Sequence, residues 1–296
     1  MSLASILRFT TMHKYVIITP AKNEEQYITF ILDSVVNQTR RPLEWIIVDD
    51  GSSDNTAGIV DGYSEKYRWI RRITKDTVSE RRGGGSKVVR AFMTGLKEMV
   101  TKDYDFVVKL DADLTLPNNY FEVVANGFEE NGKIGLCGGI CVTMKNGKAI
   151  PEKSASYHLR GPIKSYRSEC FRQIGGLREI FNWDGVDEML AMYHGWQIKI
   201  LDVQVIHHRP TSTLINNEFA DFNRAGEEYY KEGYDLVLAL VKAATMIVRG
   251  ENVIRVLFFA KGFIWALFKK EKRYFDDRYN KFARRFQYNR IRQLKM

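Results

Sequence analysis

Two aspartates one residue apart, Asp111 and Asp113, follow the apolar run Phe106–Leu110. A short run of this kind predicts a buried strand, and a break at its end would turn both carboxylates to the same side. Carboxylate oxygens are the ligands that Mg²⁺ and Mn²⁺ prefer, and such cations often bridge to substrate phosphates. Alone, an Asp-x-Asp pair is more typical of a solvated turn or a helix N-cap. Its place after a predicted buried strand favours a cation site.

A second acidic pair, Asp49 and Asp50, follows the apolar run Trp45–Val48. A carboxylate at this place could accept hydrogen bonds from a nucleobase or a ribose. Ser53 and Asp54 are typical capping residues for the helix predicted to follow. Asp49 and Asp50 come too early in the sequence to cap it, so one of them is the better candidate ligand.

A third polar cluster, Asn23 and Glu24, comes after the run Tyr15–Thr19 and Pro20. The run is rich in β-branched residues and predicts a buried strand. Glu24 would favour the N-terminal end of a helix dipole, and this role is compatible with a contact to a nucleotide.

A basic, glycine-rich segment, Arg81–Lys87, opens another helical pattern. Backbone amides at a helix N-terminus suit a phosphate group, and a cation such as Lys87 adds to that preference. The segment lacks the spacing of a P-loop. An exposed loop is an equally good interpretation.

The elements that must position these residues follow from the hydrophobic pattern. Strands are predicted at residues 15–19, 45–48, 69–73 and 106–110, with helices at 24–37, 53–66 and 87–100 between them. This alternation predicts an α/β fold with a mostly parallel central sheet and helices on both faces. Because ligands of such sheets bind beyond the carboxyl ends of the strands, we expect the three polar clusters to meet at one edge.

The second half of the chain is less regular. It predicts strands at 135–142 and 198–206, a loop and a short helix within 161–176, and a helix at 186–194. Helical patterns then continue at 219–232, 235–248, 252–270 and 276–294. We therefore predict a catalytic domain over residues 12–216 and a helical, basic C-terminal extension over 217–296.

The ordered set Pro20–Glu24, Val48–Thr56 and Asp111–Asp113 resembles the motifs of the inverting family 2 glycosyltransferases, which have the GT-A fold. The resemblance spans about residues 15–210, and Val48–Thr56 is its most specific part. It implies a nucleotide-sugar donor, with Mg²⁺ or Mn²⁺ held on the donor diphosphate by Asp111 and Asp113. The residues expected to bind the nucleotide sugar are Pro20, Ala21, Asn23, Glu24, Asp49, Asp50, Lys87, Asp111 and Ala112.

The resemblance also implies a catalytic base. Asp187 stands at the place of the family's catalytic aspartate, although the usual Glu-Asp pair reads Val186-Asp187 here. Asp184 and Glu188 are the alternatives. The chemistry requires such a base because a hydroxyl is a poor nucleophile until a carboxylate takes its proton. Attack from the face opposite the departing diphosphate would invert the anomeric centre.

Two histidines, His207 and His208, follow the predicted strand at 198–206 and precede Arg209. A neutral imidazole could ligate the same cation, as a histidine at such a place does in some relatives. The sequence leaves open which of the two does so, and a tandem pair is equally typical of a polar strand end. Arg209 could instead contact the diphosphate.

The net charge of +9 lies entirely in the tail, because residues 250–296 contain 13 Lys or Arg and 4 Asp or Glu. The apolar run at 253–268, with Arg255 and Lys261 embedded and Lys269–Arg273 directly after it, is typical of an interfacial helix on an anionic membrane. A helix packed on the domain or a contact in an oligomer is nearly as good an interpretation. Nucleic acid is disfavoured because the tail contains no recognised nucleic-acid-binding motif.

The three cysteines form no disulfide framework, which fits a reducing compartment. The first 13 residues do not resemble a secretory signal, and no stretch of about 18 uncharged apolar residues is present. These features predict a cytoplasmic protein. The tail is expected to bind peripherally at the cytoplasmic face of a membrane.

The leading hypothesis is transfer of a sugar to a hydroxyl of a lipid-linked or glycan acceptor, in the synthesis of cell-envelope polysaccharide or glycolipid. One alternative is a non-catalytic, membrane-associated assembly factor on a transferase fold. Another is a sugar-nucleotide nucleotidyltransferase, which would need a Gly-rich, Arg-containing loop in place of Pro20–Glu24. A nicotinamide enzyme is disfavoured because no G-x-G-x-x-G follows the first strand.

Overall fold

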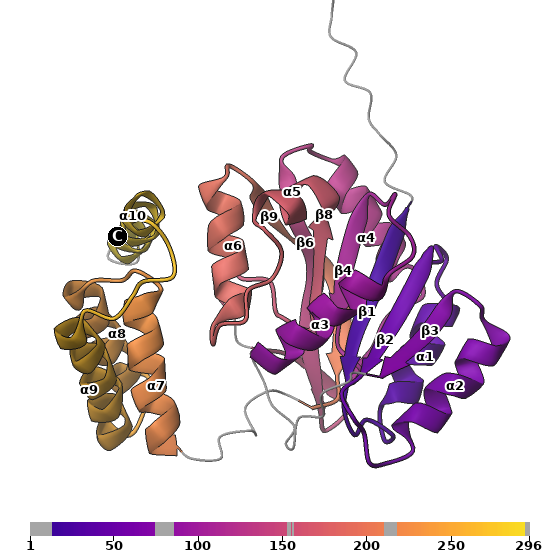
Figure 1. The fold of residues 1–296 in the computed structure, drawn as a ribbon, viewed down its shortest axis with the longest axis horizontal. Helices are drawn as coiled ribbons and strands as arrows, with labels where there is room; N and C mark the ends of the chain where they lie inside the picture. The colour runs from indigo at the N-terminus through magenta and orange to yellow at the C-terminus, as the bar shows by residue number, and fades with distance from the viewer. Residues whose placement is uncertain (1–13, 75–85, 153–154, 156, 210–217, 294–296) are drawn as a thin grey trace, which may run out of the picture. The chain divides into compact units, whose positions relative to one another are not determined.

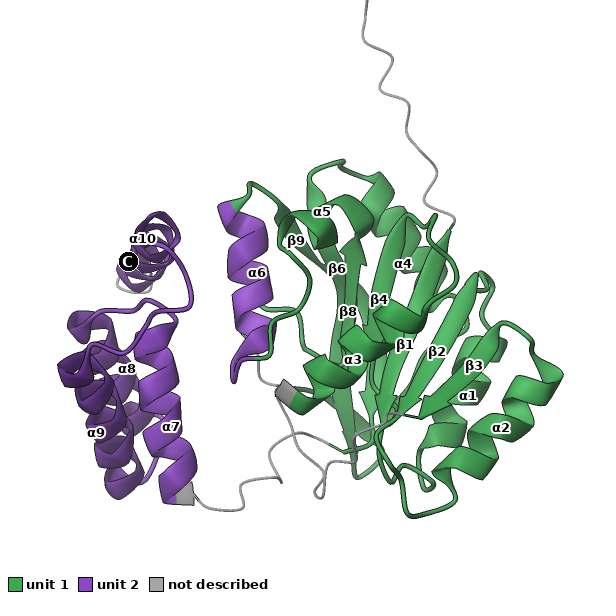
Figure 2. Ribbon diagram, in the orientation of Figure 1, with its two compact units in different colours: residues 1–179, 194–210 green, residues 180–193, 211–296 purple. Residues whose placement is uncertain are grey.

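The computed structural model describes residues 14–74, 86–152, 155, 157–209 and 218–293. The chain divides into two compact units (Figure 2). One contains residues 1–179 and 194–210, and the other contains residues 180–193 and 211–296. The second unit thus includes a helix from the middle of the chain as well as the C-terminal helices. The predicted boundary between 216 and 217 stays a prediction.

The first unit is built on a sheet whose strands lie in the order β3-β2-β1-β4-β8-β6-β9-β5, with β7 beside β6 (Figure 1). The strands are β1 (Tyr15–Ala21), β2 (Glu44–Asp49), β3 (Ile70–Thr74), β4 (Phe106–Leu110), β5 (Leu114–Thr115), β6 (Ile134–Lys145), β7 (Lys148–Pro151), β8 (Ile163–Arg167) and β9 (Gln197–His207). The first four are parallel to one another, as predicted. From β8 onward the sheet is mixed, because β8 runs antiparallel to β4 and β6 while β9 runs parallel to β6.

Helices cover both faces of the sheet (Figure 1). They are α1 (Ile28–Val36), α2 (Thr56–Lys66), α3 (Ser86–Glu98), α4 (Tyr120–Glu129) and α5 (Ser168–Gln173). Residues that alternate along each strand separate the two faces. Ile17 and Ile47 belong to the core that α1, α2 and α4 share. Ile18 and Val48 face α3 at Gly95, where a Cβ would lie 2.6 Å from Ile18 and 2.8 Å from Val48.

The second unit is helical. It contains α6 (Trp183–Tyr193), α7 (Glu218–Lys231), α8 (Leu236–Val248), α9 (Val253–Lys269) and α10 (Asp277–Gln293), so the four C-terminal helices form as predicted. α7 and α9 approach closely because each carries a glycine: a Cβ on Gly226 would lie 2.0 Å from the Phe259 carbonyl oxygen, and one on Gly262 would lie 1.9 Å from that of Asn223. Among the described helices, none is sufficiently long and apolar to cross a membrane.

Candidate active site

Three polar clusters lie at one edge of the sheet, as the sequence predicts. β1 and β2 run parallel with Ala21 opposite Asp49, and β4 runs parallel to β1 on its other side. Pro20–Glu24, Asp49–Ser52 and Asp111–Asp113 therefore follow the carboxyl ends of three neighbouring strands. This is the edge at which α/β sheets bind ligands.

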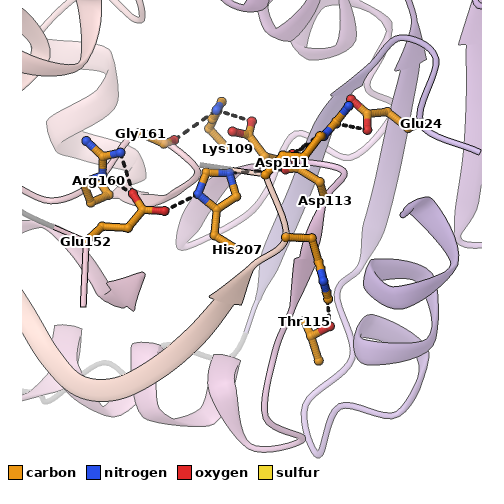
Figure 3. Close-up of polar contacts among 11 residues, drawn as sticks. Glu24, Lys109, Asp111, Asp113, Thr115, Glu152, Arg160, Gly161 and His207 are labelled. Carbon is orange, nitrogen blue, oxygen red and sulfur yellow. Dashed lines mark hydrogen bonds and ion pairs between the residues drawn. The ribbon is translucent and has the colours of Figure 1, made fainter. Parts of the chain in front are cut away.

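Asp111 is paired with a buried lysine. Lys109 lies two residues earlier on β4, and its side chain is only 2% exposed. Its Nζ forms an ion pair with Asp111 Oδ1 and donates a hydrogen bond to the Gly161 carbonyl at 3.0 Å (Figure 3). A buried ammonium is costly unless it is paired, so this contact holds both side chains in place. The Asp111 side chain remains 28% exposed and is accessible to a ligand.

Asp113 is held by Arg209. Nε and Nη2 of the guanidinium donate to Asp113 Oδ2 at 3.2 and 3.1 Å, and Nη2 also forms an ion pair with Glu24. The guanidinium carbon lies 4.9 Å from the centre of the Tyr27 ring. One cation therefore joins a carboxylate that follows β1 to a carboxylate that follows β4. The predicted alternative, a contact between Arg209 and a diphosphate, stays a prediction.

His207 faces Asp113 because β5 and β9 pair with Leu114 opposite His207. Nε2 of the imidazole lies 3.6 Å from Asp113 Oδ1, which is longer than a hydrogen bond. Its other nitrogen, Nδ1, contacts Glu152 Oε1 at 2.5 Å. Arg160 Nε in turn donates to Glu152 Oε2 at 2.9 Å (Figure 3). The contact at Nδ1 thus holds the imidazole in place, and Nε2 faces the Asp113 carboxylate.

Electrostatics in this cluster favour the charged forms. Burial acts to lower the pKa of His207, but the hydrogen bond to Glu152 and the charges of Asp113 and Asp111 raise that pKa above its ordinary value. Burial acts to raise the pKa of Glu152, but His207 and Arg160 bring that pKa below its ordinary value. A cation that binds at Nε2 would compete with a proton there.

His208 has different surroundings. Its Nε2 lies 2.8 Å from Thr115 Oγ1, and its ring stacks on Phe30 with centroids 4.5 Å apart. Burial and the charge of His207 lower the pKa of His208. Adjacent residues of a strand point to opposite faces, so only one histidine of the tandem pair can face Asp113. Of the two predicted candidates, His207 is the one that faces Asp113, and its role as a metal ligand stays a prediction.

The loops after β1 and β2 are tied together by hydrogen bonds. Asn23 has a left-handed backbone with φ of +53°. Its side-chain Oδ1 accepts from the Ser53 amide at 2.8 Å, and its own amide donates to Ser52 Oγ at 3.0 Å. Asp49 Oδ1 accepts from the Ser52 amide at 2.8 Å. Asn23 and Asp49 therefore help to build the loops that carry them.

The other predicted residues of this region lie on the same loops. The Asp50 amide donates to the Ala21 carbonyl at 2.9 Å, and Lys22 Nζ donates to the Asp50 carbonyl at 3.0 Å. Asp50 is 7% exposed, Pro20 lies at the end of β1, and Ala112 is buried between the two aspartates of the Asp-x-Asp pair.

Two predicted site residues lie on helices. Lys87 is the second residue of α3 and is half-buried. Asp187 lies within α6, is 2% exposed, and accepts a hydrogen bond from the Glu188 amide at 2.6 Å. Glu188 is also buried, whereas Asp184 is half-buried. Because α6 belongs to the second compact unit, a position for Asp187 opposite the sheet edge stays a prediction.

The residue types at the edge are those that a divalent cation prefers, and cation binding there stays a prediction. Asp111 and Asp113 supply carboxylate oxygens, and His207 presents a nitrogen whose partner nitrogen is held by a carboxylate, an arrangement typical of metal-ligating histidines. Within the described part of the chain, however, no group of three or more His, Cys, Asp or Glu side chains is already gathered as a metal site. Lys109 and Arg209 provide the positive charge beside the aspartates.

Sequence reasoning missed Lys109, Glu152 and Arg160. Lys109 has a detectable signal, since a lysine inside an otherwise apolar strand must have a partner. Glu152 and Arg160 have none, because each reaches the site only through tertiary contacts with His207 and with one another.

Residues 16–198, more than half of the chain, match the sequence profile described as "Glycosyl transferase family 2". The chain belongs to glycosyl transferase family 2. The probable glycosyltransferase YdaM of Bacillus subtilis is 35% identical over 104 residues, which cover 34% of this chain and 23% of that protein. The first curated relatives are matched over only 14% to 29% of their own length.

Two solved structures have the same fold. TarS of Staphylococcus aureus, solved in complex with UDP-GlcNAc, gives a TM-score of 0.56 at 20% identity, over 75% of this chain and 68% of that chain. The mannosyltransferase PcManGT of Pyrobaculum calidifontis, solved with GDP-Man and Mn²⁺, gives 0.56 at 15% identity, over 89% of each chain. The predicted GT-A fold is therefore confirmed.

Proposed function

We propose that this chain transfers a sugar from a nucleoside-diphosphate sugar to an acceptor hydroxyl, with inversion at the anomeric centre. Membership of family 2 supports the reaction class. The observation that carries the proposal is that Asp111 and Asp113 follow β4 at the sheet edge where β1 and β2 also end, with His207 3.6 Å from Asp113. That edge combines carboxylates for a cation with loops that can hold a nucleoside.

The donor occupies the loops that carry Pro20, Ala21, Asn23, Glu24, Asp49 and Asp50. The hydrogen bonds between Asn23 and residues 52 and 53 hold these loops together before a ligand arrives, which lowers the entropic cost of binding. Lys87, at the start of α3, supplies charge for the diphosphate. The fold neighbours were solved with UDP-GlcNAc and with GDP-Man, both nucleoside-diphosphate sugars, and this supports the same class of donor here.

Asp111, Asp113 and His207 hold Mg²⁺ or Mn²⁺ in this proposal. The cation, when bound, offsets the charge that develops on the departing nucleoside diphosphate. Glu152 keeps the imidazole of His207 oriented, and Arg209 orients Asp113 and Glu24. In this proposal these contacts orient the side chains before the donor arrives.

Asp187 is the base in this proposal. Its carboxylate takes the proton from the acceptor hydroxyl as that oxygen attacks the anomeric carbon. The hydrogen bond from the Glu188 amide fixes one oxygen of the carboxylate. Asp184 and Glu188 remain the alternatives on the same helix.

The acceptor is a lipid-linked molecule or a glycan, as in the synthesis of cell-envelope polysaccharide or glycolipid. A lipid-linked acceptor requires an enzyme that reaches the membrane surface, here the cytoplasmic face. The basic, apolar helices of the second unit support that placement.

A donor screen tests the proposal. The full chain is incubated with UDP-, GDP- and dTDP-sugars in the presence of Mn²⁺, and donor binding and hydrolysis are measured. The proposal predicts metal-dependent binding and slow hydrolysis of at least one donor. Absence of both across the panel would overturn it, and metal-dependent binding without any turnover would favour a non-catalytic role.

A further inference from the structure

The second unit contains a helical hairpin with an apolar outer surface. α8 and α9 lie side by side and are joined by Arg249–Asn252 (Figure 1). Gly250 takes a φ of +84° at the turn, and Asn252 caps α9 by accepting from the Ile254 amide at 2.8 Å. The turn is therefore well defined, and the two helices form one unit of structure.

α9 is apolar on two faces. Its inner face buries Val256, Phe259 and Phe263, and α7 packs closely on this helix at Gly262. Its outer face exposes a residue near the start of the helix and the residues three, eleven and fourteen positions after it, a spacing that puts all four on one side of a helix. They are Ile254, Leu257, Trp265 and Phe268, with Val253 and Ile264 beside them. Phe268 is 82% exposed and Leu257 is 62% exposed, values unusual for large apolar side chains in such numbers.

α8 repeats this pattern. It buries Leu238 and Ala239 but exposes Val237, Leu240 and Ile247 at helical spacing. Leu236 and Val248 extend the same exposed set, and Val248 is 86% exposed. Leu236, Val237, Leu240, Ile247, Val248, Val253, Ile254, Leu257, Ile264, Trp265 and Phe268 together are called the hairpin surface below.

Cations accompany the hairpin surface, and acids are nearly absent from it. Between Leu236 and Lys270 the chain carries six basic residues and one acid, Glu251. That acid is neutralised by an ion pair with Arg255 at 2.9 Å. Lys261 is exposed within the outer stripe of α9, and Lys269 Nζ lies 5.0 Å from the centre of the exposed Trp265 ring.

We infer that the hairpin surface docks into the interfacial layer of an anionic membrane. Apolar side chains that flank lysines match this environment, because the side chains enter the acyl boundary while the long lysine stems keep their charges among lipid headgroups. An indole such as Trp265 prefers the same layer. In this inference the hairpin lies in the plane of the membrane surface, with its exposed apolar side chains toward the lipid.

Charge decides between a membrane and a second copy of this chain. Two copies that met through the hairpin surface would bring their lysines together with few acids near them, namely Glu251, which is already paired with Arg255, and Glu271 directly after α9. An anionic leaflet supplies the missing opposite charge. The inference deepens the proposed function, because docking would bring the active site to a lipid-linked acceptor. The identity of that acceptor rests on the proposed function.

Vesicle co-sedimentation of the full chain tests the inference. Vesicles of phosphatidylcholine with phosphatidylglycerol should pellet the protein, vesicles of phosphatidylcholine alone should pellet much less, and added salt should weaken the association. The pair Lys261→Gln and Lys269→Gln should reduce partitioning by about 25-fold, since each basic group near an anionic leaflet contributes about 1 kcal/mol, or about fivefold. The matched control is Lys281→Gln with Arg285→Gln, two exposed cations of α10 outside the hairpin surface.

Insertion of the apolar side chains is tested by Leu257→Glu, with Met144→Glu as the control because Met144 is an exposed apolar residue of β6 in the other unit. The first variant should lose vesicle binding and the second should keep it, both with unchanged circular dichroism. Equal binding by both variants would overturn the inference. So would a failure to pellet together with a concentration-dependent dimer that Leu257→Glu abolishes, which would assign the surface to a second copy. Donor hydrolysis measured without vesicles reports on the proposed function separately.

Discussion

At the sheet edge the acids lie against cations from other parts of the same unit, whereas on the α8–α9 hairpin the cations lie among exposed apolar side chains with one acid nearby. Asp111 pairs with Lys109, and Asp113 and Glu24 share Arg209. Lys261 and Lys269 have aromatic rings beside them and no carboxylate in the hairpin surface. The sheet edge is thus organised by internal partners, whereas our inference assigns the hairpin surface a partner outside the chain. Four experiments test the two units that carry these regions, from the largest expected effect to the smallest.

Asp187→Asn should have the largest effect. Loss of a general base lowers transfer by about a hundredfold to ten-thousandfold, while the affinity for the donor should remain because the sheet edge is untouched. Transfer rates and donor binding measured on the same preparation make this comparison. Asp184→Asn serves as the matched variant. If Asp187→Asn weakens donor binding as much as transfer, its role as the base is wrong; if Asp184→Asn has the larger effect on transfer, Asp184 is the base.

Gly262→Ala should destabilise the second unit. A Cβ at this position would lie 1.9 Å from the Asn223 carbonyl oxygen, so α7 and α9 must separate, at a cost of about 1–3 kcal/mol or more. The control is Gly62→Ala in α2, where a Cβ has no neighbour within 4 Å. That change should raise the free energy of unfolding by about 0.5–1 kcal/mol, because alanine favours a helix over glycine. Urea denaturation curves measure both, and a neutral Gly262→Ala would contradict the close helix packing.

Glu152→Gln should weaken Mn²⁺ binding by about 10- to 100-fold, the usual effect of removing a carboxylate that orients a metal-ligating histidine. Calorimetric titration of Mn²⁺ in the presence of a nucleoside diphosphate gives the affinity directly. Glu130→Gln is the control, since Glu130 pairs with Lys199 away from His207. An unchanged Mn²⁺ affinity in Glu152→Gln would mean that His207 is not a ligand or needs no orientation.

Glu232→Gln should flatten the pH dependence of stability. Burial raises the pKa of Glu232 to about 8, although the hydrogen bond from Asn182 acts to lower that pKa. Between about pH 4.5, the ordinary pKa of a glutamate, and about pH 8, the folded state therefore keeps a proton on Glu232 that the unfolded state has released. The stabilising contribution is complete below that pH and is lost as pH rises towards about 8. Thermal unfolding across this range should show a smaller decline for Glu232→Gln than for the wild type or for Glu65→Gln, an exposed control.

The parts of the fold that the sequence predicts are those with local signals. The apolar runs of β1, β2 and β4 locate the three polar clusters, and helical spacing locates α7 to α10. β8 lacks such a signal because Lys164 and Ser165 are fully buried in its middle, so its pattern does not look apolar. α1 begins at Ile28 and not at Glu24, because the left-handed Asn23 is followed by a turn in which the Tyr27 amide bonds to the Glu24 carbonyl.

The candidate site divides in the same way. Asp111 and Asp113 can be found from the strand before them. The choice between His207 and His208 depends on the register of β9 against β5, which is a long-range property. Glu152 reaches His207 across 55 positions of sequence, so only the folded chain reveals it.

The central claim is that the sheet edge binds a nucleoside diphosphate together with a divalent cation. Calorimetric titration of UDP and GDP into the full chain, with Mn²⁺ and after its chelation, tests this claim most directly. Binding of at least one of them should depend on Mn²⁺ and should be lost in Asp113→Asn but kept in Asp202→Asn, an exposed aspartate of β9. Equal affinity with and without Mn²⁺, or an unaffected Asp113→Asn, would contradict the account.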